Sequence, residues 1–445
     1  MRSGSSTRRA AGSPVVGRSD AGLQGRRRLR WELIVLGCMY AGYMAFILCR
    51  TAIYVASPAM VEDPALGLTK TMFGAILGWG TAGMVTGKLL GGVVADRFGG
   101  RTVFLLALSV TTAAAAGFAI AGGFALFCLL NFAMLLSAAA GWPAMSKLIA
   151  AWYEPDRYGK VWGVISTSSR LSSVLSTLVL GRLLLLTTWP NVFVAAAALA
   201  AAVIAAISLF LKSGPAAAGL PPPRAGAGGE ATPHPLDGTS LREALLHFAR
   251  SGRVWLMCVS LMCTTVLMEV IGFLPLYLKE TLGISPAQAA TASAVFPAGC
   301  LVALLAGGWV YDRVPRRRRP VLLGGMLVFA ALCLGTLFAM GRAALAPETA
   351  FALTAVILFL YGLSVAPAYY LPMSVFSIEF GGPHCGVLIG LIDAAGYAAA
   401  MLYQFGGGAM VDRPGGWQNM LALLFAVSAL ATASTVWFAR EDAAA

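Results

Sequence analysis

Long uninterrupted apolar stretches dominate this chain, and most polar residues gather in short segments between them. About 20 apolar residues are enough to cross the hydrocarbon core of a bilayer as an α-helix. Backbone groups in hydrocarbon must pair within their own segment, so we interpret each stretch as a helix. The pattern predicts twelve spans, at residues 33–58, 71–95, 102–121, 123–150, 159–186, 190–211, 254–278, 286–311, 320–341, 349–376, 385–411 and 416–438.

The composition supports a membrane protein. The chain is 58% hydrophobic and only 11% charged, whereas soluble domains carry about 25% charged residues. These values exclude a soluble globular domain and predict an all-α membrane protein.

A short sequence occurs twice, at corresponding points of the chain. Residues 91–97 read Gly-Gly-Val-Val-Ala-Asp-Arg, and residues 307–313 read Gly-Gly-Trp-Val-Tyr-Asp-Arg, an offset of 216 in a chain of 445 residues. Internal duplication is typical of secondary transporters, which hold the substrate between the two units. We therefore expect two pseudo-symmetric six-helix halves, at residues 31–211 and 254–438.

The segments outside the two halves are polar or basic. Residues 1–30 are rich in Arg, Ser and Gly, which predicts a disordered basic tail; a transit peptide has similar composition and remains an alternative. In the linker, residues 212–253, the Pro- and Gly-rich first part predicts disorder, and residues 240–250 have the apolar spacing of an amphipathic helix on the membrane surface. Residues 439–445 form a short C-terminal tail.

The net charge of +13 would suit nucleic acid if it were not so unevenly placed. Of the 32 Lys and Arg residues, 23 fall in the termini and loops on the N-terminal side of the predicted membrane, five near the other surface and four inside spans. The positive-inside rule then predicts that both termini are cytoplasmic. Topology and attraction to lipid headgroups explain the basic balance without a nucleic-acid partner. We expect a monomer in the plasma or inner membrane, with an organelle membrane as the alternative.

Enzymatic and metal chemistry are not indicated. Seven of the eight cysteines lie inside predicted spans, and the three histidines show no metal-ligand spacing. We expect no disulfide, metal or cofactor. No nucleophile–base constellation is visible, so the sequence does not predict an enzyme.

The repeated motif lies at the predicted cytoplasmic ends of spans two and eight. An acid at such a position can accept hydrogen bonds from the positive N-terminus of a neighbouring helix, a contact that holds one arrangement of the bundle and breaks in another. The alternative is a simple topogenic turn with snorkelling charges. Because the motif occurs in both halves, we expect a gating role for Gly92, Asp96, Arg97, Arg101, Gly308, Asp312 and Arg313.

Six charged residues fall inside the predicted spans. A charge in mid-helix costs about 2.5–3.5 kcal/mol on insertion scales, so such residues usually face a cavity, a partner or a substrate. The first half carries only cations and the second half only acids, namely Arg50, Lys88, Lys147 and Arg170 against Glu269 and Asp393.

The depth of two arginines predicts an anion site. Arg170 is about ten residues inside its span, or roughly 15 Å at 1.5 Å per residue, which reaches the midplane. Arg50 lies two-thirds along span one and can reach the same region. Two guanidinium groups suit a phosphate or carboxylate through paired hydrogen bonds. Lys88 could attract an anion at the inner entrance, while Lys147 lies about one turn from the edge, where snorkelling is the alternative.

Other roles remain open for the same charges. Arg50 could pair with Asp393 or Glu269 across the bundle, and Arg170 could snorkel. The two acids could carry protons, because burial raises a carboxyl pKa and a nearby cation lowers it.

The motif at 92–101, Gly-x-x-x-Asp-Arg-x-Gly-x-Arg, resembles the signature loop of the major facilitator superfamily, although Gly100 stands where that family often has a basic residue. The resemblance implies the twelve-helix major facilitator fold and alternating access.

A narrower resemblance covers much of both halves. Residues 141–147 (Gly-Trp-Pro-Ala-Met-Ser-Lys), Trp152 and residues 165–168 are similar to the organophosphate:phosphate antiporter family, which includes glycerol-3-phosphate and hexose-phosphate exchangers. The similarity resumes at 274–280 and 390–417.

This family resemblance implies roles for particular residues. Arg50 occupies the position of a phosphate-contacting arginine, Tyr43 that of a tyrosine near the site, and Lys88 that of a span-two lysine. Lys147 falls where the family has Lys or Arg, and residues 392–396 resemble an Asp-containing segment of eukaryotic sugar-phosphate members.

Two departures accompany the resemblance. Leu267 stands where bacterial members place a second clamping arginine, and Arg170 stands where the family has His or Asn. The second cation has then moved across the site.

Together these observations predict a secondary carrier for a small organic anion, a phosphate ester first, with inorganic phosphate or a proton as the coupled ion. The anion would bind between Arg50 and Arg170. The alternatives are a proton-coupled carrier of a carboxylate or other small solute that uses Glu269 or Asp393, and a membrane sensor that binds its ligand without moving it. Three further tyrosines could line the site or serve as packing residues, namely Tyr369, Tyr370 and Tyr397.

Overall fold

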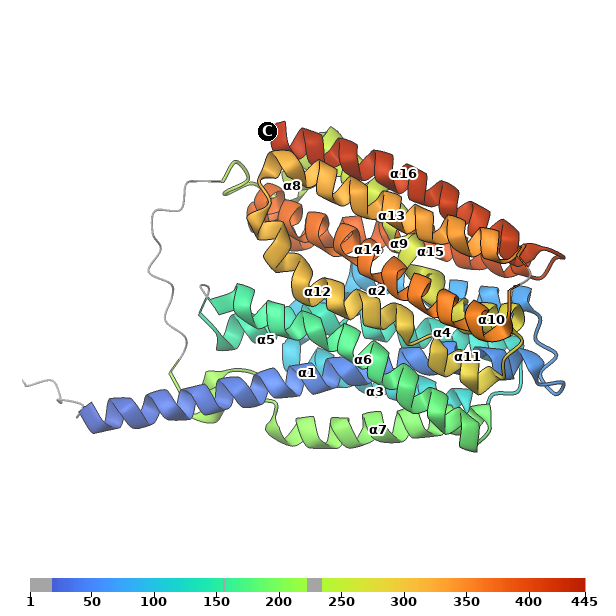
Figure 1. The fold of residues 1–445 in the computed structure, drawn as a ribbon. Helices are drawn as coiled ribbons and strands as arrows, with labels where there is room; N and C mark the ends of the chain where they lie inside the picture. Colours follow the sequence, from blue (N-terminus) through green and yellow to red (C-terminus); the bar gives the residue numbers. More distant parts are fainter. Residues whose placement is uncertain (1–17, 155–156, 222–233, 344, 445) are drawn as a thin grey trace, which may run out of the picture.

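The protein is a bundle of long helices that run roughly parallel between two ends (Figure 1). The computed structural model describes residues 18–154, 157–221, 234–343 and 345–444. The end that carries the start of α1, the end of α16 and the segment between the halves is called the linker end, and the opposite end is called the far end. In Figure 1 the linker end is on the left.

Each half contributes six spans, and several are built from two helices. The N-terminal half consists of α1 (Arg18–Glu62), α2 (Lys70–Phe98), α3 (Gly100–Phe118), α4 (Phe124–Ala139) with α5 (Gly141–Trp152), α6 (Tyr158–Leu186) and α7 (Trp189–Phe210). The C-terminal half consists of α9 (Gly252–Met268) with α10 (Leu274–Leu282), α11 (Pro286–Ala292) with α12 (Val295–Arg313), α13 (Arg319–Met340), α14 (Pro347–Gly381), α15 (Cys385–Val411) and α16 (Gly416–Ala444).

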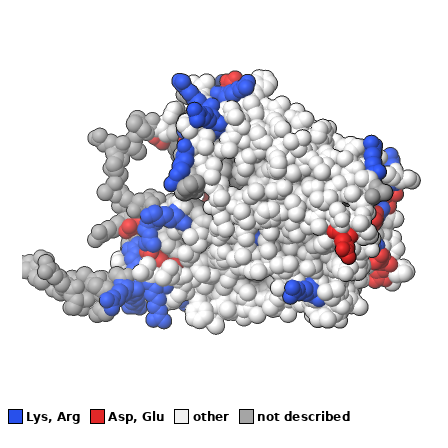
Figure 2. Space-filling view, viewed as in Figure 1, with Lys and Arg blue, Asp and Glu red and all other residues white. Residues whose placement is uncertain are grey.

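The described helices have the length and composition to cross a membrane. Ten segments meet that criterion, and one of them, Pro347–Val411, contains both α14 and α15. Together with α2, which is 29 residues long, they account for the twelve predicted spans. Figure 2 shows the charged side chains gathered at the two ends, with a broad uncharged belt between them. The all-α membrane fold predicted from the apolar pattern is therefore confirmed.

The halves touch through neighbouring pairs of helices. α2 packs against α15, while α6 packs against α11 and α12. A Cβ atom on Gly408 would lie 2.7 Å from the backbone oxygen of Lys70, and one on Gly74 would lie 2.6 Å from that of Gln404. Only glycine allows the two helices to approach this closely, as is common between membrane helices.

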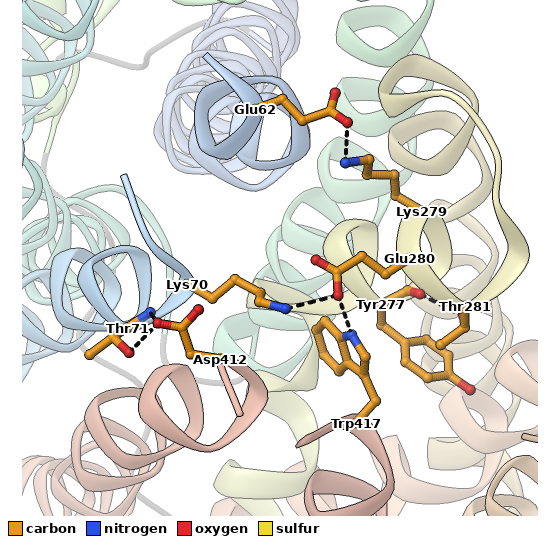
Figure 3. A network of polar contacts seen from close by, with 9 residues as sticks. All are labelled: Glu62, Lys70, Thr71, Tyr277, Lys279, Glu280, Thr281, Asp412 and Trp417. Carbon is orange, nitrogen blue, oxygen red and sulfur yellow. Dashed lines mark hydrogen bonds and ion pairs between the residues drawn. The ribbon is translucent and has the colours of Figure 1, made fainter. Parts of the chain in front are cut away.

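Polar contacts also join the halves at the far end (Figure 3). Glu280 Oε2 lies 3.0 Å from Lys70 Nζ and accepts a hydrogen bond of 2.7 Å from Trp417 Nε1. Thr71 Oγ1 donates to Asp412 Oδ2 at 2.6 Å, and Lys279 pairs with Glu62. We call these residues the far-end network: Glu62, Lys70, Thr71, Lys279, Glu280, Asp412 and Trp417.

Two ion pairs at the linker end connect residues of the same half. Lys147 pairs with Asp96 at 2.5 Å in the N-terminal half, and Arg316 pairs with Glu379 at 2.5 Å in the C-terminal half. With the far end tied across the halves by glycine contacts and the far-end network, the structure represents a state that is closed at the far end.

The N-terminal segment differs from the sequence prediction. Residues 1–17 lie outside the described part of the chain, but α1 begins at Arg18, so residues 18–30 are helical instead of disordered. A helix that is already stable propagates easily, because each added residue gains one hydrogen bond. At the other end of the chain, α16 continues through the predicted tail to Ala444.

The linker is partly ordered where disorder was predicted. A short 3₁₀ helix, Pro215–Ala218, packs on the N-terminal half, and Arg27 donates to the oxygen of Ala218 at 3.1 Å. Residues 222–233 lie outside the described part of the chain. The structure has a helix where the amphipathic pattern predicts one, α8 (Leu241–Arg250), capped by Ser240. Its Phe248 is buried, with its ring centroid 6.2 Å from that of Phe380 in α14.

Candidate functional site

Five charged side chains lie in the middle of the spans. Four of them form two ion pairs, and the fifth, a cation, has no acidic partner among the described residues. Arg50, Lys88 and Arg170 come from α1, α2 and α6 of the N-terminal half, while Glu269 and Asp393 come from the C-terminal half. We call these five residues the central cluster.

The first ion pair links α1 to the break after α9. Arg50 Nη2 lies 2.6 Å from Glu269 Oε1, with side chains 17% and 8% exposed. Arg50 Nε also donates to Tyr54 Oη at 2.8 Å. Gln404 Nε2 donates to the other carboxylate oxygen at 3.2 Å, and Gln404 Oε1 accepts from Thr81 at 2.5 Å. Both charges are thus neutralised and hydrogen-bonded, which a charge in hydrocarbon requires.

A helix break brings Glu269 to this position. α9 ends at Met268, residues Glu269–Gly272 form a 3₁₀ turn, and α10 begins at Leu274 with Pro275 in its first turn. Proline is tolerated in the first turn of a helix, because a backbone N–H at that position would have no partner within the helix. Tyr361 donates to the oxygen of Leu267 at 2.8 Å, which satisfies a carbonyl near the break. Discontinuous helices of this kind line the substrate sites of many transporters.

The second ion pair links α2 to α15. Lys88 Nζ lies 2.6 Å from Asp393 Oδ2, and the same ammonium lies 5.6 Å from the centroid of the Tyr397 ring. The close packing of the two helices continues here, since a Cβ on Gly390 would lie 3.8 Å from the backbone oxygen of Lys88. Both pairs therefore run from a cation of the N-terminal half to an acid of the C-terminal half.

Arg170 differs from the other two cations. Among the described residues, no carboxylate lies within ion-pair distance of it and no side chain or carbonyl accepts a hydrogen bond from it. Its guanidinium carbon lies 4.9 Å from the centroid of the Tyr370 ring, and its Nε is buried without a hydrogen-bond partner. Since the two acids are already paired, the central cluster carries one net positive charge. An unpaired charge at this depth is costly, so the arrangement favours the binding of an anion.

The other predicted binding residues separate into two groups. Tyr43 belongs with the central cluster: it has electrostatic interactions with Arg50, Lys88 and Arg170, and its ring packs on Trp142 at 5.4 Å. Lys147 does not, because its side chain is 51% exposed at the linker end and pairs with Asp96. For Arg50, the alternative of an ion pair with Glu269 describes this state of the protein.

The first copy of the repeated motif forms the turn that its sequence predicts. α2 ends at Phe98 and α3 begins at Gly100, with Gly99 between them at φ 79°, where glycine is favoured. Arg101 donates to the oxygens of Leu211 and Ser208 at 2.6 and 2.9 Å, which fixes the start of α3 to the end of α7.

In the first copy, Asp96 pairs with Lys147 of its own half, and no hydrogen bond to it from the N-terminus of a neighbouring helix is found among the described residues. The gating role expected of the motif stays a prediction. Gly92 and Arg97 lie on the exposed surface. In the second copy, Gly308, Asp312 and Arg313 occupy the last turns of α12, and the side chain of Asp312 lies outside the described part of the chain.

Three residues of the site were missed in the sequence: Tyr54, Thr81 and Gln404. Each is a polar side chain inside an apolar span. Gln404 lies eleven residues after Asp393, which is about three helical turns and places both on one face. Tyr54 is one turn after Arg50. Helical spacing from the charged residues could have identified these two.

Metal chemistry finds no support in the described residues, where no group of three or more His, Cys, Asp and Glu side chains could hold an ion.

The sequence is similar to those of known membrane proteins. The family model described as Major Facilitator Superfamily matches residues 39–277 and 268–445. The "Membrane sensor protein UhpC" of Salmonella typhimurium is 27% identical over 346 residues, 75% of each chain. The "Probable hexose phosphate transport protein" of Chlamydia pneumoniae is 24% identical over 68% of this chain and 70% of its own. The "Hexuronate transporter" of Bacillus subtilis is 23% identical over 92% of this chain and 94% of its own.

Solved structures share the fold. A bacterial homologue of the human lysosomal transporter Spinster, in an inward-facing and unoccupied conformation, aligns with a TM-score of 0.70 at 16% identity, covering 92% of this chain and 97% of its own. A D-xylose–proton symporter aligns with a TM-score of 0.69 at 14% identity and the same coverage. At these identities the likeness shows the architecture and not the substrate.

Proposed function

We propose, starting from the fact that this chain belongs to the Major Facilitator Superfamily, that it carries a small organic anion across a membrane by alternating access. The chain is an integral, multi-pass membrane protein of a transporter family and not an enzyme. The two halves would rock about the central cluster, which would open in turn to the two sides of the bilayer.

The observation that carries this proposal is the state of Arg170. It is a guanidinium deep in a span, with no acceptor among the described residues and with one buried N–H unpaired. Arg50 and Lys88 already have carboxylate partners, so Arg170 is the cation that an incoming anion would neutralise first. A guanidinium suits phosphate, sulfonate and carboxylate because its donors form a planar fork.

Several relatives support an acidic substrate. Their names refer to transport of hexose phosphate, hexuronate, sulfoacetate or glycerol 3-phosphate, all of which are small organic anions. We propose a phosphate ester as the first candidate.

Exchange of ion pairs would link binding to movement. If Arg50 exchanges Glu269 for the anion, the released carboxylate can accept a proton or a new partner. Inorganic phosphate leaving on the opposite side, or a proton carried by Glu269 or Asp393, would be the coupled ion. The positive-inside distribution supports a cytoplasmic linker end in the plasma or inner membrane.

Counterflow in proteoliposomes tests the proposal. Vesicles with purified protein are preloaded with one of inorganic phosphate, glycerol 3-phosphate, glucose 6-phosphate, glucuronate or sulfoacetate, and uptake of the same labelled compound is measured. We expect uptake of at least one anion and a loss of at least tenfold in Arg170→Gln, with partial activity in Arg170→Lys. Uptake that is equal in wild type and Arg170→Gln would contradict the site.

A second candidate function is a membrane sensor, because a relative named as such matches three quarters of this chain. A sensor would bind the anion at the same cluster without moving it. Binding that is abolished by Arg170→Gln, together with no counterflow in wild type for any anion bound, would favour the sensor over the carrier.

A further inference from the structure

Tyr370 faces the unpaired arginine from the other half of the molecule. It lies in α14 of the C-terminal half, and Arg170 lies in α6 of the N-terminal half. The guanidinium stands over the Tyr370 ring at 4.9 Å. The contact therefore joins the two halves through a cation–π interaction and without any hydrogen bond.

The hydroxyl of Tyr370 is also unsatisfied. It is buried and has no hydrogen-bond partner among the described residues. Two other buried tyrosines of the bundle have partners: Tyr361 donates to the oxygen of Leu267 at 2.8 Å, and Tyr54 accepts from Arg50 at 2.8 Å, whereas the Tyr403 hydroxyl has none among the described residues. A buried hydroxyl without a partner is destabilising, so an acceptor that reached both this hydroxyl and the Arg170 guanidinium would satisfy one donor from each half.

We propose that Tyr370 is the anion contact of the C-terminal half, so that the acidic group of the substrate accepts hydrogen bonds from the Arg170 guanidinium and from the Tyr370 hydroxyl together. This inference rests on the proposed function. The Tyr370 hydroxyl is then the ligand opposite Arg170, and the bound anion connects the two halves.

An anion that contacts both halves also affects the equilibrium between the conformational states. Arg170 as a whole is only half-buried, so part of its side chain remains accessible. Once bound, the anion satisfies one donor on each half, so it stabilises the state in which α6 and α14 are drawn together. A ligand shifts a conformational equilibrium only by its difference in affinity for the two states, and a contact shared between the halves supplies such a difference.

The test compares Tyr370→Phe with Tyr403→Phe. Tyr403 is a matched control because its hydroxyl is also buried and unpaired, but it belongs to an aromatic contact with Phe273. Each variant is purified as the full chain. The ligand is the anion that gives the strongest counterflow with wild type in the panel above. Titration calorimetry measures the Kd of each variant for this anion. The melting temperature of each variant is measured without ligand.

Tyr370→Phe should raise the Kd about tenfold, the effect of losing one hydrogen bond to a charged group, while the ligand-free melting temperature stays the same or rises. A structural role would instead lower the melting temperature and leave the Kd unchanged. Tyr403→Phe should leave the Kd unchanged, and the effects of Tyr370→Phe and Arg170→Gln should not add, because both remove the same bridge.

Loss of the Tyr370 contact can be distinguished from loss of the anion site itself. If Arg170→Gln abolishes binding while Tyr370→Phe binds as well as wild type, Tyr370 is not a ligand and the anion site stands. If wild type binds none of the five anions, the proposed function falls and the inference falls with it.

Discussion

The Arg50–Glu269 pair shows how individual residues can hold two halves together and still allow them to part. Both charges are largely removed from water, and Tyr54 and Gln404 complete their hydrogen bonds. Removing one partner of a buried pair leaves an uncompensated charge, which typically costs about 3–5 kcal/mol, whereas neutralising both partners costs much less.

Neutral substitutions therefore separate the structural role of this pair from its role in transport. Arg50→Gln should lower the melting temperature of the purified protein, and the double variant Arg50→Gln/Glu269→Gln should recover most of the loss. Counterflow should be abolished in both, because the anion loses Arg50. A double variant no more stable than the single one, or normal counterflow in Arg50→Gln with normal insertion, would contradict this view of the pair.

The sequence indicated which charged residues lie inside the spans but not how they pair. A charge in an apolar span is visible as a pattern, and all five members of the central cluster were predicted in this way. Whether Arg50 would meet Asp393 or Glu269 depends on how the two halves pack, and no local pattern carries that information. Gln404 was missed because an uncharged amide is a much weaker signal in an apolar span than a carboxylate.

At the scale of helices, the crossing of α2 and α15 decides how tightly the far end closes. The two backbones touch through Gly74 and Gly408, with no side chain between them. Gly406 lies in the same helix, but a Cβ there would meet nothing within 4 Å. A substitution of Gly406 is therefore a matched control for a larger side chain at Gly408.

Gly408→Val should hold the far end apart, while Gly406→Val should not. A new side chain in a packed contact costs about 1–3 kcal/mol, which weakens the closed state relative to the open one. Spin labels on Gly122→Cys, in the loop before α4, and Glu348→Cys, in the first turn of α14, would report the separation in a variant without native cysteines. The distance should lengthen only for Gly408→Val; an unchanged distribution would mean that the helices do not close through this contact.

Helix positions followed from the apolar pattern, but several boundaries and breaks did not. Span four was predicted as continuous, yet α4 ends at Ala139 and α5 begins at Gly141. Span seven breaks at Glu269 and span eight near Ser293. Backbone irregularity at membrane depth is tolerated where it is buried in protein, and that condition belongs to the packed bundle rather than to the local sequence.

At the scale of the whole molecule, closure of the far end depends on charged residues that sit outside the spans. Asp412 lies just after α15 and accepts two hydrogen bonds from Thr71 of the other half, at 3.3 and 2.6 Å. Partial burial works against ionisation of this carboxyl, but the Thr71 hydrogen bonds and nearby Lys70 outweigh it, so the pKa of Asp412 is lowered from its ordinary value of 3.8. Asp63 is comparable in chemistry, with a pKa lowered by hydrogen bonds from Trp189 and Ala65, but these partners belong to its own half.

The sign of the pH dependence follows from that lowering. A carboxyl whose pKa is lower in the closed state stabilises closure above its ordinary pKa, and this contribution is lost as the pH falls through the lowered value. The distance between labels at residues 122 and 348 should therefore be constant from about pH 8 to about pH 5 and lengthen only below about pH 4. Asp412→Asn, which cannot ionise, should lengthen it already at pH 7 and weaken its response to acid, whereas Asp63→Asn should behave as wild type. If Asp412→Asn keeps the short distance at pH 7, then the glycine contact of α2 and α15 and the remaining ion pairs close the far end without it.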